Sequence, residues 1–76
     1  MVSFEKQIKW TKNEVETINM ICTVHYPNRK LIIGELGAFS CTIKWNDGHV
    51  FVKGDLEKVM NRLCGLTYDL NYLLDR

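Results

Sequence analysis

An Asn-Asp-Gly triplet at residues 46–48 constrains the fold more than any other feature of the sequence. Asp-Gly between two segments of alternating apolar and polar residues is typical of a two-residue β-hairpin loop. With that pair as the loop, Trp45 would face Val50 on the opposite strand. Ile43 would likewise face Val52, so apolar residues meet across the hairpin and the register agrees with the hydrophobic pattern. We therefore predict an antiparallel hairpin here, whose first strand starts near Phe39.

Alternation of apolar and polar residues predicts further strands before the hairpin. A turn around Pro27 ends the longest of them, and Leu31 and Ile33 can continue its buried face up to a bulge or break marked by Gly34 and Gly37. Residues 3–10 fit a strand or a helix, and we favour the strand. The alternating apolar residues of segment 15–26 are Ile18, Met20, Cys22, Val24 and Tyr26.

The apolar spacing changes to three and four residues after residue 54, which predicts an amphipathic helix over about residues 55–75. Asp55 can accept hydrogen bonds from the free amides of the first turn. Gly65 interrupts the pattern and marks either a break or a close backbone contact. The apolar stripe consists of Leu56, Val59, Met60, Leu63, Leu66, Leu70, Leu73 and Leu74.

These elements predict one small α+β domain over residues 1–76. We expect an antiparallel β-meander of four or five strands within about residues 3–53, with one C-terminal helix packed on one face. No apolar run approaches the roughly 20 residues that span a bilayer. Three widely spaced cysteines, an odd number, are typical of reduced and buried thiols rather than of a disulfide framework. We expect a soluble cytoplasmic protein without a membrane partner.

The sequence indicates no catalytic chemistry. Cys22 and His25 have the spacing of a metal-ligand pair, but on a strand they would point to opposite faces, so we expect no metal site. A catalytic nucleophile needs an oriented base, and His25 and His49 are expected as surface residues of the sheet. No glycine-rich phosphate loop is present. We therefore expect no catalytic residues and no cofactor.

Two surfaces are candidates for binding a partner. The first is the outer face of the predicted sheet, because exposed apolar patches commonly mark interaction sites. Its residues are Ile21, Ile32, Phe51 and Lys44, unless the N-terminal segment covers them. The second lies on the C-terminal helix, away from the leucine stripe. Its residues are Asn61, Gly65, Tyr68 and Tyr72, unless the tyrosines lie over a sheet edge.

The leading hypothesis is a non-enzymatic protein-binding module that regulates or inhibits a larger protein partner by occluding one of its surfaces. Size alone suggests an analogy with the compact accessory and anti-defence inhibitors of bacteriophages and mobile elements. One alternative is a small structural subunit of an oligomer, and the outer face could close a homodimer. Another is a nucleic-acid-binding domain, although a net charge of +1 provides little attraction. It would use Lys9, Arg29, Lys30, Lys44, Lys53 and Phe51.

Overall fold

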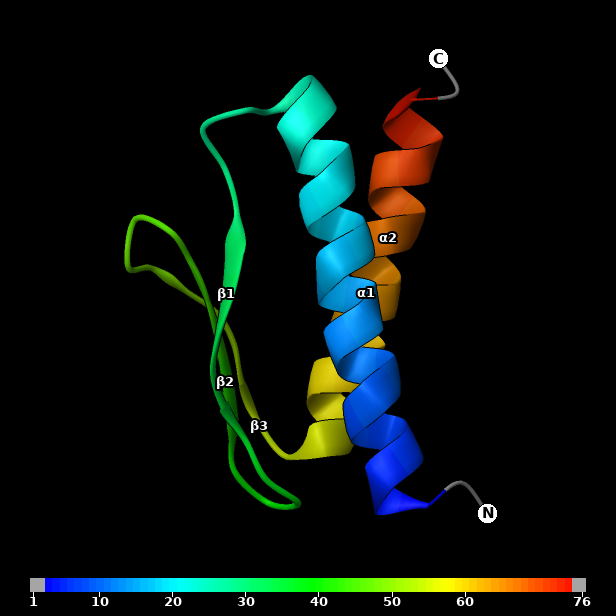
Figure 1. The fold of residues 1–76 in the computed structure, drawn as a ribbon, viewed down its shortest axis with the longest axis vertical. Coiled ribbons are helices and arrows are strands. Elements are labelled where there is room, and N and C mark those ends of the chain that lie inside the picture. The colour runs from blue at the N-terminus through cyan, green and yellow to red at the C-terminus, as the bar shows by residue number, and fades with distance from the viewer. Residues whose placement is uncertain (1–2, 75–76) are drawn as a thin grey trace.

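Two long helices cover one face of a three-stranded antiparallel sheet (Figure 1). The computed structural model describes residues 3–74, with side chains to residue 71. The strands follow the order β1-β2-β3 across the sheet. The two helices run in the same direction, and the second face of the sheet stays open (Figure 1). In chain order the elements are α1 (Phe4–His25), β1 (Leu31–Leu36), β2 (Cys41–Trp45), β3 (Val50–Gly54) and α2 (Leu56–Leu74).

The α+β class predicted from the sequence is confirmed, but the arrangement differs. Between residues 3 and 74 the sheet has three strands, not four or five, and a second helix stands where the first strands were expected. The strand predicted over residues 15–26 and the strand favoured over residues 3–10 are both wrong, because the two segments form the single helix α1.

Helix α1 is specified by a stripe of buried residues that recur at spacings of three and four. Its four buried residues are Thr11, Val15, Ile18 and Cys22. By contrast, Met20 is 65% exposed, although strand alternation would bury it beside Ile18 and Cys22. At the start of the helix, the hydroxyl of Ser3 accepts a hydrogen bond from the backbone N–H of Lys6 at 3.3 Å. The side chains thus bury one face of a 22-residue helix.

Three threonines fit into α1 although their branched side chains favour strands. The hydroxyls of Thr11, Thr17 and Thr23 donate to the carbonyl four residues earlier, at 2.8, 3.0 and 2.8 Å respectively. Each hydroxyl is thereby satisfied within the helix. The 0% exposed Thr11 consequently buries no unpaired polar group.

The predicted hairpin between β2 and β3 is present with a longer loop. Ile43 does face Val52, but Val50 faces Lys44 rather than Trp45. The Trp45 N–H donates to the His49 carbonyl at 2.9 Å, so residues 46–48 form a three-residue loop. Its last residue, a glycine, has a φ of +96°, which glycine adopts without strain. A bulge at Phe51 then restores the predicted register.

Strand β1 also has the predicted bulge. Ile33 pairs with Ile43 and Glu35 pairs with Thr42, which leaves Gly34 between them without a partner. Phe39, in contrast, does not belong to the strand predicted for it, since β2 begins at Cys41.

Helix α2 confirms the predicted amphipathic helix. The carboxylate of Asp55 accepts a hydrogen bond from the Lys58 backbone N–H at 2.8 Å and so caps the first turn, as expected. The helix continues through Gly65 without a break. The side chains of Leu73 and Leu74 lie outside the described residues. The buried residues of the stripe are Leu56, Val59, Leu63 and Leu70.

Replacing Gly65 by alanine is expected to stabilise the protein by about 1 kcal/mol, because alanine is the better helix former. A Cβ at this position would meet no atom within 4 Å. The melting temperature should rise by about 4–8 °C in a thermal scan followed by circular dichroism. Gly54→Ala is the contrasting variant, since its φ is +154° and a Cβ would lie 2.7 Å from Lys58 Cδ. A lower melting temperature for Gly65→Ala would show a close contact at this helix position.

Candidate functional site

The open face of the sheet mixes apolar and charged side chains. Ile32, Lys44 and Val50 form one row across the three strands. Ile32 is 49% and Val50 53% exposed, with the exposed Lys44 between them. A second row consists of Glu35, Thr42 and Lys53. Two of the predicted binding residues, Ile32 and Lys44, thus lie together here, but they do not form a continuous apolar patch.

Two other residues expected on this face lie elsewhere. Ile21 belongs to α1 and packs against the core. The Phe51 ring makes an edge contact with the Trp45 ring at 5.5 Å between centroids, and the Arg62 guanidinium of α2 lies 4.7 Å from the Phe51 centroid. Because Phe51 is the additional residue of the bulge, strand alternation does not predict its direction. It packs toward the helices and not toward solvent on the open face.

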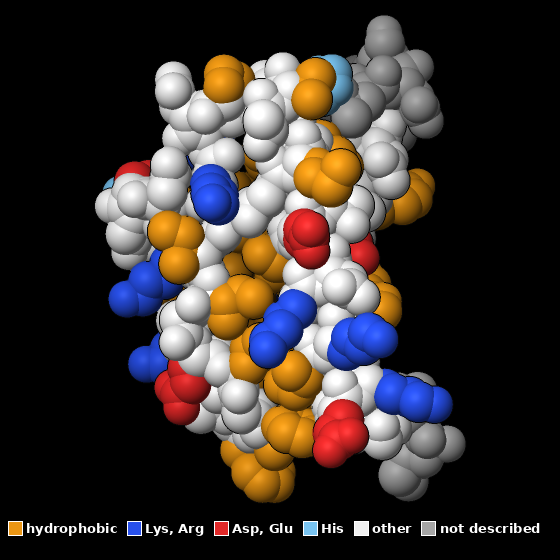
Figure 2. Space-filling view, in the orientation of Figure 1, with side chains coloured by type: hydrophobic (Ala, Val, Ile, Leu, Met, Phe, Trp, Pro, Cys, Tyr) orange, Lys and Arg blue, Asp and Glu red, His pale blue; other side chains and the backbone are white. Residues whose placement is uncertain are grey.

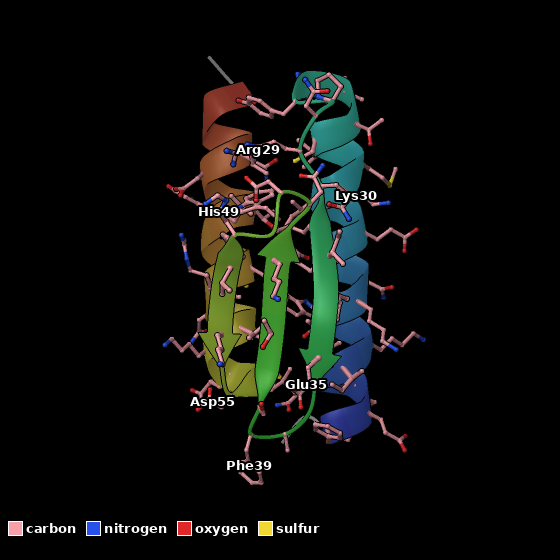
Figure 3. All side chains as sticks on the ribbon, turned by 90° about the vertical axis from the view of Figure 1, so that its left-hand side faces the viewer. Arg29, Lys30, Glu35, Phe39, His49 and Asp55 are labelled. Atoms are coloured by element: carbon pink, nitrogen blue, oxygen red, sulfur yellow. The ribbon has the colours of Figure 1, made fainter. Side chains whose placement is uncertain are left out.

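Phe51, the aromatic residue proposed for stacking on nucleic acid, already contacts an arginine side chain. The Arg62 guanidinium lies 4.7 Å from the Phe51 ring centroid. The Arg29 guanidinium likewise lies 5.0 Å from the Trp45 ring centroid. Arg29, Lys30 and His49 gather at one end of the sheet, whereas Glu35 lies at the other end (Figure 3). The predicted basic residues are therefore not collected in one groove: Lys44 and Lys53 lie on the sheet, and Lys9 lies on α1.

The helix surface expected on α2 is partly described. Asn61, Gly65 and Tyr68 are exposed. Tyr68 is 73% exposed, so no sheet edge covers it. The Tyr72 side chain lies outside the described residues.

A hollow of about 470 Å³ opens where both helices begin, beside the β1–β2 loop. Phe39, at the tip of this loop, is 90% exposed and points away from the sheet (Figure 3). Phe4, at the start of α1, is 47% exposed. Hydrophobic side chains gather at the same end of the molecule and along the seam between α1 and the sheet (Figure 2). The lining residues are Phe4, Gln7, Ala38, Phe39, Asp55, Leu56, Glu57, Met60 and Asn61.

Neither Phe39 nor this hollow was predicted as a binding site from the sequence, and of the lining residues only Asn61 was a predicted binding residue. One signal was present: Gly37 and Ser40 flank the aromatic residue, and such residues favour turns. In the structure the Gly37 N–H donates to the Ser40 carbonyl at 3.0 Å and closes the turn that carries Phe39. The turn thereby holds the large apolar side chain of Phe39 in solvent.

The cysteines and histidines do not form a site between residues 3 and 71. Cys22 and Cys41 are buried as predicted, but Cys64 is exposed, which corrects the expectation of three buried thiols. Burial raises the pKa of the Cys22 thiol, and the Arg29 guanidinium opposes part of that increase.

The geometric reason given against metal binding was also wrong. Residues three apart are neighbours on a helix, although here Cys22 is buried and His25 is exposed. His49 Nδ1 lies 3.1 Å from a carboxylate oxygen of Asp47 in the exposed hairpin loop. No group of three or more histidine, cysteine or acidic residues in the described part of the chain could hold a metal ion.

No protein-family model, curated protein or solved structure matches this chain. Within residues 3–74, neither helix combines the length and the apolar character that crossing a bilayer requires.

Proposed function

We propose that this chain is a small non-enzymatic protein-binding module that regulates or inhibits a larger protein by occluding part of its surface. The observation that carries the proposal is Phe39, an aromatic side chain 90% exposed at a loop tip beside an apolar hollow. Burying such a side chain in a partner contributes about 1.5–3 kcal/mol. A protruding aromatic residue and an adjacent hollow together offer a partner both an anchor and a pocket.

Several features favour a protein partner over nucleic acid. Arginine side chains lie against the Trp45 and Phe51 rings, so these rings do not offer free stacking platforms. The acidic residues Asp55 and Glu57 line the hollow, and carboxylates repel phosphates. Among the described residues, Phe39 is the most exposed large apolar side chain, and it lies beside a hollow lined by two carboxylates.

The Phe39→Ala variant is expected to weaken partner binding about 30-fold, the equivalent of about 2 kcal/mol at a hot spot. Its melting temperature should stay close to that of the parent, because the side chain contributes almost no buried area. The measurement is an affinity capture from cell lysate followed by titration of the captured partner. Met20→Ala is the control, since it truncates another exposed apolar side chain, on α1 and outside the hollow lining, and it should bind the partner as the parent does.

The capture is repeated after nuclease treatment and in about 0.5 M salt, because binding through phosphates weakens steeply with salt. Capture that survives both treatments and depends on Phe39 supports the proposal. Capture that nuclease abolishes would favour the nucleic-acid alternative. A chain that captures only its own copies, with a dimer mass in light scattering, would favour the oligomer subunit. Equal binding by Phe39→Ala and the parent would contradict the proposed role of this residue.

A further inference from the structure

The hollow beside Phe39 has acidic but no basic side chains in its lining. Asp55 and Glu57 contribute carboxylates, Gln7 and Asn61 contribute amides, and no lysine or arginine lines it. Asp55, Glu57 and Asn61 also line a neighbouring hollow, where they lie together with the basic residues Lys58 and Arg62. An apolar depression with an acidic rim therefore stands at the end of the molecule where Phe39 protrudes.

The carboxylates of Asp55 and Glu57 can attract a cation into the hollow. Among residues 3–71, neither carboxylate forms a salt bridge; the one such contact joins His49 Nδ1 to Asp47 at the hairpin loop. Asp55 uses one carboxylate oxygen to accept the backbone N–H of Lys58. Glu57, exposed in the first turn of α2, is the freer of the two. A cation that enters the hollow would meet both groups, while Lys58 and Arg62 lie on their other side, in the neighbouring hollow.

We infer that this hollow binds a partner segment in which an apolar side chain is accompanied by a cationic group such as lysine or arginine. This inference rests on the proposed protein-binding function and names the chemistry of the partner. Phe4, Leu56, Met60 and Phe39 supply the apolar contact, and a volume of about 470 Å³ suits a side chain of aromatic size. The acidic rim selects the cation, because complementary charges favour one partner and like charges exclude another.

Two small probes of opposite charge test the inference without the partner itself. 4-Phenylbutylamine and 4-phenylbutyrate share the phenyl ring and the linker length but differ in the sign of the charged group. Each is titrated into the ¹⁵N-labelled full chain, and the backbone amide signals are followed by two-dimensional NMR. We expect the amine to shift the signals of Gln7, Ala38 and Asn61 and to bind about fivefold more tightly than the carboxylate.

Glu57→Gln is expected to remove most of that preference while it leaves binding of the phenyl ring in place. Glu16→Gln is the matched control, because it makes the same chemical change at an exposed position of α1 outside the hollow lining. This control should keep the full preference for the amine. The pattern of shifted signals also reports whether each variant remains folded.

Equal or tighter binding of the carboxylate, signal changes away from the hollow, or no binding of either probe would each overturn the inference. The result is separable from the test of the proposed function. If Phe39→Ala loses the partner but the probes show no preference for the cation, the binding function stands and the partner chemistry is wrong. If the amine binds as expected but Phe39→Ala captures the partner unchanged, the proposed use of Phe39 fails and the charge preference stands.

Discussion

Replacing Leu63 by alanine is expected to lower the free energy of unfolding by about 2–5 kcal/mol. Leu63 is 0% exposed in the middle of α2 and belongs to the same core cluster as Ile18 of α1 and Ile43 of β2. Truncation would leave a cavity between the helices and the sheet. Since small domains have a total stability of about 5–15 kcal/mol, a 76-residue chain would lose a large part of it.

Urea denaturation followed by circular dichroism measures this loss as a lower midpoint. Tyr68→Ala is the control on the same helix, because Tyr68 is 73% exposed. Its midpoint should remain near that of the parent, since exposed substitutions usually change stability by about 0.5 kcal/mol or less. A Leu63→Ala midpoint equal to that of Tyr68→Ala would mean that α2 is not packed on the core as described.

The parts of the fold that sequence could predict are those with a complete local signal. Helix α2 has an N-cap at Asp55 and a long stripe with a single interruption, and both signals agree. The hairpin has its Asp-Gly turn and the facing pair Ile43 and Val52. Each of these elements could be recognised without knowledge of what packs against it.

Helix α1 was missed because the strand period of two and the helix period of 3.6 place some of the same residues on one face. Ile18 and Cys22, four residues apart, lie on one face of a strand and equally on one face of a helix. Met20 and Val24 completed the strand pattern, but they are 65% and 74% exposed in the structure. Val15, Ile18 and Cys22 follow spacings of three and four residues, and Thr11, whose hydroxyl is satisfied by a backbone carbonyl within the helix, extends the same face by one turn. The alternating residues Met20 and Val24 outweighed this helical pattern in the prediction.

The candidate site was harder to predict than the fold. Alternation placed Ile32 and Lys44 together on the open face, but it also assigned Phe39 to a strand and Phe51 to the outer face. Both errors come from irregular backbone: a turn carries Phe39, and a bulge redirects Phe51. Alternation holds only while the strand is regular, so a side chain next to a turn or bulge has no predictable direction.

A side-chain amide joins α1 to β1 in addition to their apolar contact. The Asn19 Oδ1 accepts the Leu31 backbone N–H at 2.7 Å, and the Asn19 Nδ2 donates to the Leu31 carbonyl at 3.0 Å. Leu31 is 2% exposed, so water has little access to replace these bonds. Asn19 therefore satisfies both backbone groups of a residue in an edge strand, which also keeps them from pairing with another chain.

Asn19→Ala is expected to cost about 2–3 kcal/mol, because it leaves a buried donor and a buried acceptor without partners. Urea denaturation measures the loss, and hydrogen exchange should show the Leu31 amide losing protection. Asn13→Ala is the control, since Asn13 is exposed on the same helix and alanine is the better helix former there. Asn19→Asp separates the two bonds: it keeps the acceptor but sets a carboxylate oxygen against the Leu31 carbonyl, so it should be no more stable than Asn19→Ala. An Asn19→Ala variant as stable as Asn13→Ala would show that apolar packing alone holds β1 against α1.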